Sequence, residues 1–460
     1  MKIRKLNIKN YKLFDNLELD FTDENGKTLD TIVLAGVNGS GKTSLLELLK
    51  EIFSRKPEKE LAHLLKDFQI KLELEIPSHT EKSLILNIIQ KEYTKIARYN
   101  TEPSTVLEMM SLLLNTLKSP HLIFTLCYKG ERRDNQIVIK QNDFMLFEKL
   151  GKAGFDFKLC YIPSETYLNT SSTLNTSSTP FSKEHSDLEA LEKYITQQDN
   201  GLVRVIDFAV HKYAVEKYIV NSVVEKLLSN RKEKAEDVIQ ESTQVINNCF
   251  SDIKLFTKLV DITAKEAIFE SFNCKKIGIN DLSHGEKQLF YQAVYLNNLN
   301  LQNSIIMVDE PETSLHPSWQ QAILKLYQKA GKNNQVIVAT HSPFLIASVK
   351  PEELFLFALN QEAQACEIIN AAKASKHTKG LEPNRIIQEI MEVPLRDIDI
   401  QRRIDELSER LRLYPEDYDK PEMQALINDL IEDLGKQDPF VMRLNHQLMM
   451  IRRKQNQLTQ

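Results

Sequence analysis

Cysteine, long apolar runs and net positive charge are all scarce in this sequence. The five cysteines are scattered, odd in number and without CxxC spacing, which predicts reduced thiols and argues against disulfides or a cysteine zinc site. The longest apolar runs, such as "IFTLC" and "SIIMV", are far shorter than the ~20 residues of a membrane-spanning helix. The net charge of −5 gives no general attraction for nucleic acid, although a local basic patch is compatible with it.

The overall composition is that of a soluble globular protein. Hydrophobic residues make up 42% of the 460 residues and charged residues 27%. This length allows two or three domain cores, or one domain with large insertions. The first stretch, "MKIRKLNIKNYKLFDNLELDF", alternates as a strand does and has no apolar block typical of a signal peptide. We therefore expect a cytoplasmic protein with no membrane partner.

A glycine-rich loop follows the third expected strand. Residues 2–9 and 17–21 alternate as strands do, and 31–36 ("TIVLAG") is a buried apolar run. That run leads directly into "GVNGSGKT" at 36–43, which precedes the helical pattern "SLLELLKEIF". Strand, loop and helix in this order predict a P-loop, whose glycines let backbone N–H groups approach phosphates.

The chemistry of a P-loop assigns roles to its polar residues. Lys42 is expected to neutralise the outer phosphates of a nucleotide, and the Thr43 hydroxyl to ligate Mg²⁺. ATP and Mg²⁺ are therefore the expected cofactors. The expected nucleotide contacts of this loop are Gly36, Asn38, Gly39, Ser40, Gly41, Lys42, Thr43 and Ser44.

The middle of the chain has mixed patterns. "FQIKLELEI", "HLIFTLCYK" and "QIVIKQND" are expected to be strands, and 104–117 a helix. The hexamer "LNTSST" occurs twice, at 168–173 and 174–179, and such a polar repeat predicts an exposed loop. Helical spacing of apolar residues extends over 186–249, including "VRVIDFAVHKYAVEKYIVNSVVEKLL". Two expected strands follow, "LFTKLVDIT" and "EAIFESFNCKKIGIN".

The segment "DLSHGEKQLF" at 281–290 is a second candidate anion site. Ser283 and Gly285 stand directly ahead of an amphipathic helix. The start of a helix offers unpaired backbone N–H groups and the positive end of a dipole to an anion. The chain thus has two such helix starts, far apart in sequence.

Two later buried strands end in polar residues. The apolar run 305–308 ends in Asp309 and Glu310, and "QVIVATHSP" carries His341 at its end. In open α/β sheets, ligands lie at the carboxyl edge of the strands. Asp309 is therefore expected to hold the Mg²⁺ that Thr43 also contacts. Glu310 is expected to orient or deprotonate the attacking water, and His341 to sense or polarise the γ-phosphate.

Taken in order, "GVNGSGKT", "LSHGEKQ", "MVDEPETSLHP" and "ATHSP" resemble the ABC-type ATPase head of the SMC, RecF and OLD group. The resemblance spans residues 1 to about 345. It implies that Ser283 and Gly285 contact the γ-phosphate held by the P-loop of a second chain. Two chains would then enclose two ATP molecules head to tail, which explains two anion sites in one sequence.

Other residues are carried over from the same resemblance. Glu286 is expected among the nucleotide contacts of the signature motif, and Ser314 matches the position where the family's D-loop crosses the dimer interface. His284 stands where the family usually has a second glycine. The glutamine loop has three candidates, which the sequence leaves open: Gln69, Gln141 and the segment "YIPSE".

Two features indicate which branch of this group the sequence resembles: the distance between the P-loop and the signature, and the domains of other branches that the sequence does not show. The gap between the P-loop and the signature is longer than in membrane-transporter heads, and "DEPETSLHP" resembles the soluble, DNA-metabolism branch. The helical segment is too short for the arms of SMC or Rad50-type proteins. After His341 the sequence shows no Asp-x-Asp at a strand end and no HNH-like or zinc-ligand cluster, so no nuclease of its own is expected.

The tail, 381–460, has helical and highly charged patterns throughout. An ATPase head with such a tail resembles the PtuA subunit of Septu anti-phage systems and its retron-associated relatives. That resemblance implies a small HNH-nuclease partner, PtuB. The tail is either a platform for that partner or a helical cap on the core.

The expected fold is α/β: an ABC-type P-loop ATPase head with an inserted helical lobe and an all-helical C-terminal extension. The expected parts are 1–185 (core with P-loop), 186–250 (helical lobe), 251–380 (core with signature, Walker B and histidine) and 381–460 (extension). The expected function is a Mg-ATPase that dimerises around nucleotide and controls a PtuB-like nuclease in defence. A RecF-like DNA repair clamp without a nuclease is the alternative, and direct DNA contact is left open.

Overall fold

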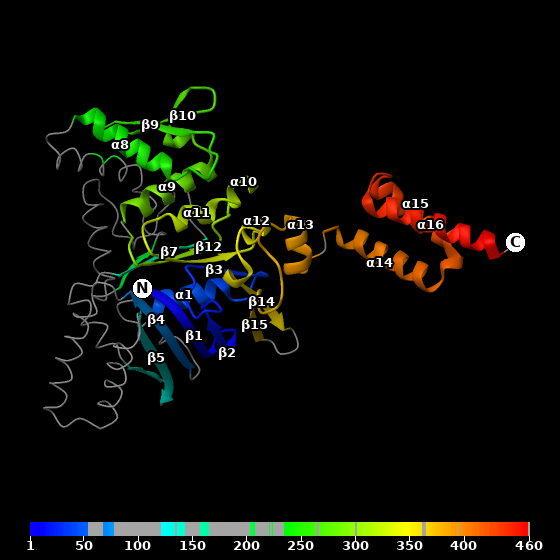
Figure 1. Cartoon of the computed structure of the whole chain (residues 1–460), viewed down its shortest axis with the longest axis horizontal. Coiled ribbons are helices and arrows are strands. Elements are labelled where there is room, and N and C mark those ends of the chain that lie inside the picture. The colour runs from blue at the N-terminus through cyan, green and yellow to red at the C-terminus, as the bar shows by residue number, and fades with distance from the viewer. Residues whose placement is uncertain are drawn as a thin grey trace. The chain divides into compact units, whose positions relative to one another are not determined.

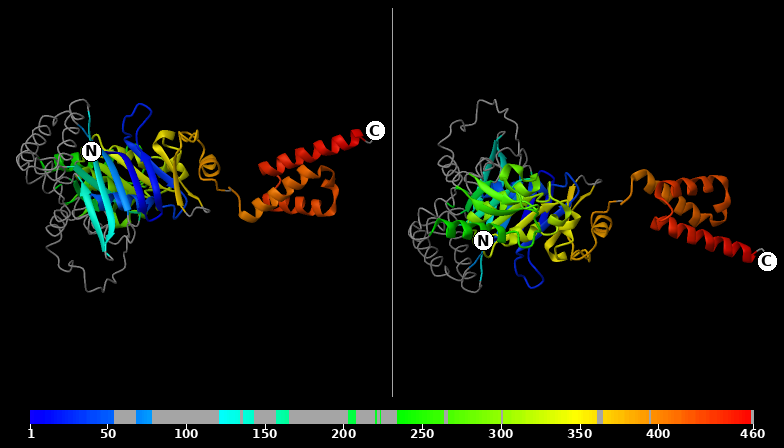
Figure 2. Two further views of the ribbon diagram at one scale, coloured as in Figure 1. Left: turned by 90° about the horizontal axis from the view of Figure 1, so that it is seen from below. Right: turned by 90° about the horizontal axis from the view of Figure 1, so that it is seen from above.

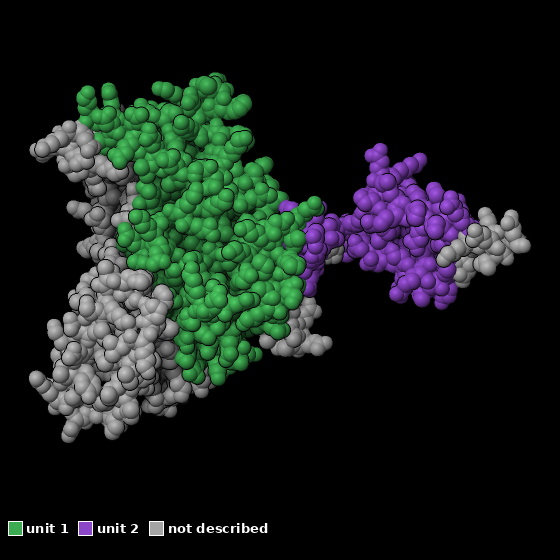
Figure 3. Space-filling view, in the orientation of Figure 1, with its two compact units in different colours: residues 1–382 green, residues 383–460 purple. Residues whose placement is uncertain are grey.

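The chain forms two compact units, residues 1–382 and residues 383–460 (Figure 3). Each unit has its own hydrophobic core. The expected helix at 104–117 and the tandem "LNTSST" segment lie outside the described residues. The computed structural model describes residues 1–53, 68–77, 121–133, 136–142, 157–164, 203–207, 220, 223, 234–263, 266–299, 301–360, 365–393 and 395–458.

A seven-stranded sheet is the centre of the first unit, with strand order β15-β14-β3-β13-β12-β7-β8. Neighbouring strands are parallel except β14 and β15. Strands β3, β12 and β13 are buried along almost their whole length, which explains why their sequences are continuous apolar runs. The strands are β3 (Thr31–Gly36), β7 (Phe157–Ile162), β8 (Val203–Asp207), β12 (Ile305–Asp309), β13 (Gln335–Thr340), β14 (Leu354–Asn360) and β15 (Ala365–Asn370).

Strand β8 corrects the expectation of helix throughout 186–249. Val203–Asp207 pair in parallel with β7 at the end of the central sheet. The sequence V-R-V-I-D combines β-branched residues with alternation, and both favour a strand. Helical spacing in the flanking residues hid this short segment. Within the same region α8 (Ala235–Asn248) is helical, and a separate helical lobe stays a prediction.

A second sheet is antiparallel, with strand order β2-β1-β4-β5-β6. Its inner face and the central sheet enclose α1 (Lys42–Ile52), because one core cluster contains buried residues of β1, β4, α1 and β3. Figure 1 shows this sheet, in blue to cyan, beside α1, and Figure 2 shows the same sheet from two further sides. Its strands are β1 (Lys2–Tyr11), β2 (Phe14–Asp20), β4 (Phe68–Pro77), β5 (His121–Arg133) and β6 (Gln136–Asn142).

A small antiparallel sheet, ordered β11-β10-β9, precedes the signature helix. Its strands are β9 (Lys258–Ile262), β10 (Ala267–Glu270) and β11 (Lys276–Gly278). The expected single strand "EAIFESFNCKKIGIN" is therefore wrong in detail, because a turn at 271–275 divides it into β10 and β11. In Figure 1, α9 lies between this small sheet and the central sheet.

Six further helices, from one to four turns long, belong to the described part of the first unit. They connect the signature, the carboxylates after β12 and the histidine after β13. Their bounds are η2 (Ile279–Asp281), α9 (His284–Asn298), α10 (Pro317–Gln320), α11 (Ile323–Gln328), α12 (Pro343–Ile346) and η3 (Pro351–Glu353).

The second unit is helical in all its described elements. Its core consists of apolar residues at helical spacing, including Ile404, Leu407 and Leu411 from α14 and Ile427 and Leu430 from α15. This packing gives residues 398–458 a core of their own. The elements are α13 (Pro383–Arg385), η4 (Ile386–Ile390), α14 (Ile398–Leu413), η5 (Pro415–Asp419), α15 (Pro421–Leu434) and α16 (Pro439–Leu458).

Truncating a central residue of this core should unfold the second unit before the first. Leu407 is fully buried, so Leu407→Ala is expected to cost about 2–5 kcal/mol of local stability. Leu413→Ala, on the same helix but 55% exposed, is the matched control and should change stability by less than about 0.5 kcal/mol. Amide hydrogen exchange of the full chain measures this as lost protection within 398–434. Equal exchange in the two variants would show that Leu407 does not support this core.

Candidate functional site

The P-loop connects the end of β3 to the start of α1. Gly41, the residue before α1, has φ 99°, a conformation that glycine adopts without strain. The Lys42 side chain turns back into the loop and donates hydrogen bonds to the carbonyl oxygens of Gly36 and Val37, both at 3.0 Å. Its Nζ also lies 3.4 Å from Ser40 Oγ. The loop therefore holds an ammonium group at the place where phosphates are expected.

The ammonium of Lys42 is buried as well as charged. Burial lowers the pKa of Lys42 to about 8, while the nearby carboxylates of Glu310, Asp309 and Glu312 act in the opposite direction. A desolvated cation gains from any further negative charge brought close to it. The position is therefore suited to a bound polyphosphate, whose negative charge would raise the pKa of Lys42 again.

Thr43 and Asp309 meet across the sheet edge. The Thr43 hydroxyl donates a hydrogen bond of 2.9 Å to Asp309 Oδ2. The other oxygen, Oδ1, is buried without a hydrogen-bond partner among the described residues. Burial raises the pKa of Asp309 to about 6, against the hydrogen bond from Thr43. A hydroxyl beside a buried, unsatisfied carboxylate oxygen fits Mg²⁺, which prefers such oxygen ligands.

Glu310 and His341 form the next part of the site. Glu310 has φ 47°, and its backbone N–H donates to the carbonyl oxygen of Ala339 at 2.8 Å. This bond fixes the end of β12 against β13. Glu310 Oε1 lies 3.4 Å from His341 Nε2. Burial, followed by the charge of Lys42, lowers the pKa of His341, so its imidazole is mainly neutral near pH 7.

Glu312 is a site residue that the motif analysis missed. Its Oε1 accepts hydrogen bonds from the Thr340 hydroxyl at 2.6 Å, and from the backbone N–H groups of His341 at 2.7 Å and Ser342 at 3.0 Å. Burial raises the pKa of this carboxyl. Glu312 therefore positions the loop that carries His341. The one sequence signal was a further acidic residue directly after "DEP".

The signature Ser283 caps α9. Its hydroxyl accepts from the Glu286 N–H at 3.3 Å, and Glu286 Oε2 accepts from the Ser283 N–H at 3.1 Å and hydroxyl at 2.7 Å. Glu286 Oε1 accepts from the Thr257 hydroxyl at 2.7 Å. Both oxygens of this buried carboxylate are thus engaged within the chain. Glu286 is therefore a capping residue, and its expected contact with nucleotide stays a prediction.

The D-loop residue Ser314 lies against the signature. It has φ 63°, and a Cβ at Gly285 would lie 2.7 Å from the Ser314 carbonyl oxygen. Only glycine fits this close approach. Sequence had placed Gly285 and Ser314 in separate motifs, and the structure brings them into contact.

The glutamine-loop candidates differ in their positions. Gln69 is exposed on β4, and Gln141 lies in β6 of the same antiparallel sheet. Ser164, in the "YIPSE" segment, lies two residues after β7, the strand that pairs with β12, and it acts to lower the pKa of Asp309 against the effect of burial. The segment after β7 is therefore placed beside Asp309, the expected Mg²⁺ ligand.

The expected site residues thus fall into two groups. Lys42, Thr43, Asp309, Glu310 and His341 converge on one edge of the central sheet. The hydrogen bonds of Ser283 involve only its own helix, through Glu286 and Lys287. Within the described residues, the signature therefore has no hydrogen bond to the P-loop of its own chain.

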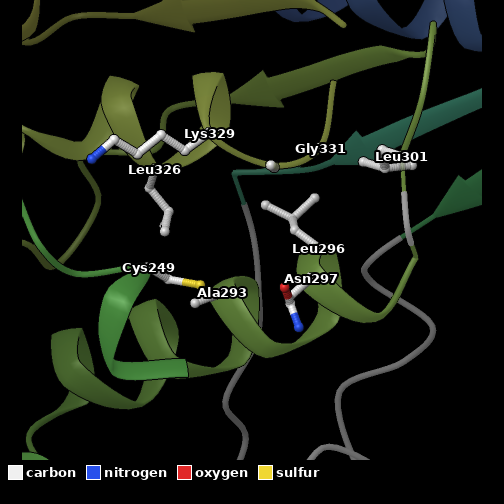
Figure 4. Close-up of a pocket in the computed structure, with 9 residues that line it drawn as sticks. Cys249, Ala293, Leu296, Asn297, Leu301, Leu326, Lys329 and Gly331 are labelled. Atoms are coloured by element: carbon white, nitrogen blue, oxygen red, sulfur yellow. The ribbon is translucent and has the colours of Figure 1, made fainter. Parts of the chain in front are cut away.

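A cavity elsewhere in the first unit is not the nucleotide site. It has a volume of about 120 Å³ and lies between α9 and α11 (Figure 4). Ligand pockets usually measure about 300–1,000 Å³, and no P-loop residue lines this cavity. Its lining consists of Cys249, Ala293, Leu296, Asn297, Leu301, Leu326, Lys329, Ala330 and Gly331. Separately, none of the helices in the described part of the chain has the length and apolarity needed to span a bilayer.

Several known proteins are similar in sequence. The chain is 23% identical over 398 residues to the Retron Vc95 probable ATPase of Vibrio cholerae, covering 77% of this chain and 73% of that protein. It is 24% identical over 436 residues to the Retron Ec83 probable ATPase of Escherichia coli, covering 82% and 75%. A shorter match to the Septu protein PtuA of Bacillus thuringiensis has 22% identity over 178 residues, covering 37% and 44%.

Two solved structures are also similar to this chain, with lower sequence identity than these relatives. The SMC head domain from Thermotoga maritima has 13% identity and a TM-score of 0.39, covering 80% of this chain and 99% of that one. The Smc head bound to the C-winged helix domain of ScpA has 11% identity and a TM-score of 0.42, covering 82% and 99%.

A family model extends over most of the chain. The model described as the AAA ATPase domain matches residues 1–224 and 210–346. These residues include the P-loop, the signature, the carboxylates after β12 and His341. The sequence matches make the chain a distant homologue of the two retron ATPases and of PtuA. The chain belongs to the AAA ATPase domain family.

Proposed function

We propose that this chain binds and hydrolyses ATP, and that two copies enclose two nucleotides between them. The observation that supports this most is the convergence of a buried lysine, a hydroxyl–carboxylate pair and a glutamate–histidine pair at one sheet edge. Phosphoryl transfer needs positioning and charge neutralisation more than covalent chemistry. These side chains supply both.

Each residue has a distinct part in the proposed reaction. Lys42 binds the outer phosphates. Mg²⁺, when bound at Thr43 and Asp309, neutralises charge on the phosphate oxygens. Glu310 orients the attacking water and accepts its proton, and its carboxylate lies within hydrogen-bonding reach of His341 Nε2. His341, beside this carboxylate, is placed to sense or polarise the γ-phosphate.

The signature of a second chain completes this proposed site. Ser283 and Gly285 lie at the first turn of α9, a helix of 15 residues. Such a helix start presents backbone N–H groups and the positive end of a dipole to an anion. Because Ser283 has no hydrogen bond to its own P-loop among the described residues, a head-to-tail dimer gives this helix start a phosphate to bind. Glu286 contributes indirectly, by holding Ser283 in place.

Two substitutions separate binding from hydrolysis. Lys42→Ala should weaken ATP binding about 10- to 150-fold, because it removes charge-assisted hydrogen bonds to phosphate. Glu310→Gln keeps the size of the side chain but removes the base, so it should bind ATP normally and lose about 10²–10⁴-fold in turnover. Calorimetry with ATP and a phosphate-release assay measure the two effects.

Two exposed positions provide matched controls. Lys332→Ala and Glu367→Gln make the same chemical changes on the surface of the first unit, and both should leave binding and turnover unchanged. Parental turnover in Glu310→Gln would contradict the assigned base.

Mixing two inactive variants tests the composite site. Lys42→Ala removes the P-loop lysine. His284→Glu places a carboxylate at the exposed first position of α9, where it suits the helix dipole but repels phosphate. In a mixed head-to-tail dimer one of the two sites is intact. An equal mixture should therefore recover about one quarter of the wild-type ATPase activity. A mixture no more active than its components would place each signature in the site of its own chain.

We further propose that nucleotide state controls a small HNH nuclease, similar to PtuB, in anti-phage defence. The similarity to two retron ATPases and to Septu PtuA supports this role. The second unit offers a surface for such a partner, because Met442 and Met449 on α16 are 61% and 59% exposed. These two residues lie seven apart, on one face of the helix.

A pull-down of the full chain, tagged at its N-terminus and expressed from its native locus, tests this role. A small protein with HNH metal ligands should copurify in stoichiometric amount. Met442→Glu combined with Met449→Glu should remove it, because two charges would be buried against the partner. Leu413→Glu, at a similarly exposed position on α14, is the control and should retain it. Recovery of the chain alone, with DNA-stimulated ATPase activity, would instead support the RecF-like clamp.

A further inference from the structure

The turn between β10 and β11 presents an aromatic ring to solvent. Phe272 is 87% exposed, more than any other large apolar side chain in the described chain. The turn around it is ordered by two backbone hydrogen bonds, Ser271 N–H to Lys275 O at 3.0 Å and Cys274 N–H to Ser271 O at 2.8 Å. Cys274 has φ 58°, as in a three-residue hairpin loop that ends in a left-handed residue. The backbone that carries the ring is therefore ordered, and the ring projects into solvent.

Lysines surround this ring. Lys275 and Lys276 lie three and four residues after it, at the end of the turn, and are exposed. In the small sheet, Lys276 pairs with Glu270, which pairs in turn with Lys258. Directly opposed residues of antiparallel strands lie on the same face, so two lysines flank one glutamate there. None of these three lysines forms an ion pair with any residue that the structure describes.

A second exposed ring lies close to the same sheet. Phe256, two residues before Lys258, is 66% exposed. Its ring centroid is 6.3 Å from that of Trp319. The surface thus combines two solvent-facing aromatic rings with three lysines that form no ion pair with any residue in the described part of the chain. We refer to Phe256, Lys258, Phe272, Lys275 and Lys276 as the basic-aromatic hairpin.

We propose that the basic-aromatic hairpin binds single-stranded nucleic acid. Unpaired bases offer flat faces for stacking on Phe272, and the phosphates between them suit the lysines. A duplex interior offers no such faces, because its bases stack on one another. An acidic protein surface would use the lysines but leaves the outward ring without a matching partner. The proposal goes beyond ATP hydrolysis, and its binding test needs no ATP.

The hairpin is also connected to the ATPase machinery. Strand β11 leads through η2 directly to Ser283. Trp319 donates a hydrogen bond from Nε1 to the Lys254 carbonyl oxygen at 3.0 Å, and its ring lies beside Gly285. Trp319 therefore lies between Phe256 of the hairpin surface and Gly285 of the signature. Since Trp319 is the only tryptophan in the chain, its fluorescence reports on this link.

The test is fluorescence anisotropy of the full chain with a labelled oligothymidylate of about 20 nucleotides, long enough for such a site. Phe272→Ala should weaken binding about 5- to 150-fold, as expected for the loss of one stacked base. Phe272→Tyr keeps a stacking ring and should bind as the wild type does. Lys275→Glu with Lys276→Glu should weaken binding and flatten its dependence on salt. Tyr414→Ala, an exposed aromatic position on the second unit, is the control and should have no effect.

Further titrations identify which class of ligand the hairpin prefers. An oligouridylate of the same length separates RNA from DNA as the preferred strand, and a duplex should bind less tightly than either. Trp319 fluorescence should change on titration with the wild type and not with Phe272→Ala. Unchanged affinity in Phe272→Ala, or equal competition by polyglutamate, would overturn the proposal.

Discussion

The hydrogen bond between Thr43 and Asp309 is the contact on which the candidate site depends. It joins the first turn of α1 to the end of β12 across 266 residues of sequence. It can form because β3, β13 and β12 lie side by side and parallel, which brings their carboxyl ends to one edge. The P-loop, the carboxylates and His341 meet there for the same reason. The long segments between these strands leave that register intact.

This edge carries electrostatic costs that a ligand would relieve. Burial favours the neutral form of three side chains here. It lowers the pKa of Lys42 and raises the pKa values of Asp309 and Glu312. Asp309 Oδ1 and Glu312 Oε2 are buried without hydrogen-bond partners among the described residues. An unsatisfied buried polar group costs about 1–3 kcal/mol. A cation at Asp309 and phosphates at Lys42 would compensate these charges, so we expect binding of Mg-ATP to stabilise this edge.

The sequence predicted those parts of the candidate site whose residues are neighbours in the chain. The P-loop after β3 and the acidic end of β12 each consist of a buried strand and a few adjacent polar residues. Glu312 and Ser164 act through partners distant in sequence, so no local pattern identified their roles. The capping role of Glu286, with two hydrogen bonds to Ser283 and one to Thr257, also depends on Thr257, a residue outside its motif. Strand β8 was hidden because its alternation is short and its neighbours have helical spacing.

The proposed dimer is tested most directly by the mass of Glu310→Gln in solution, with and without Mg-ATP. This variant should bind nucleotide without turning it over, so closed dimers accumulate. Analytical ultracentrifugation should then show a shift to twice the nucleotide-free mass, and Lys42→Ala added to the same chain should abolish the shift. A mass unaffected by Mg-ATP, at concentrations where ATP binding is saturated, would contradict a site shared between two chains.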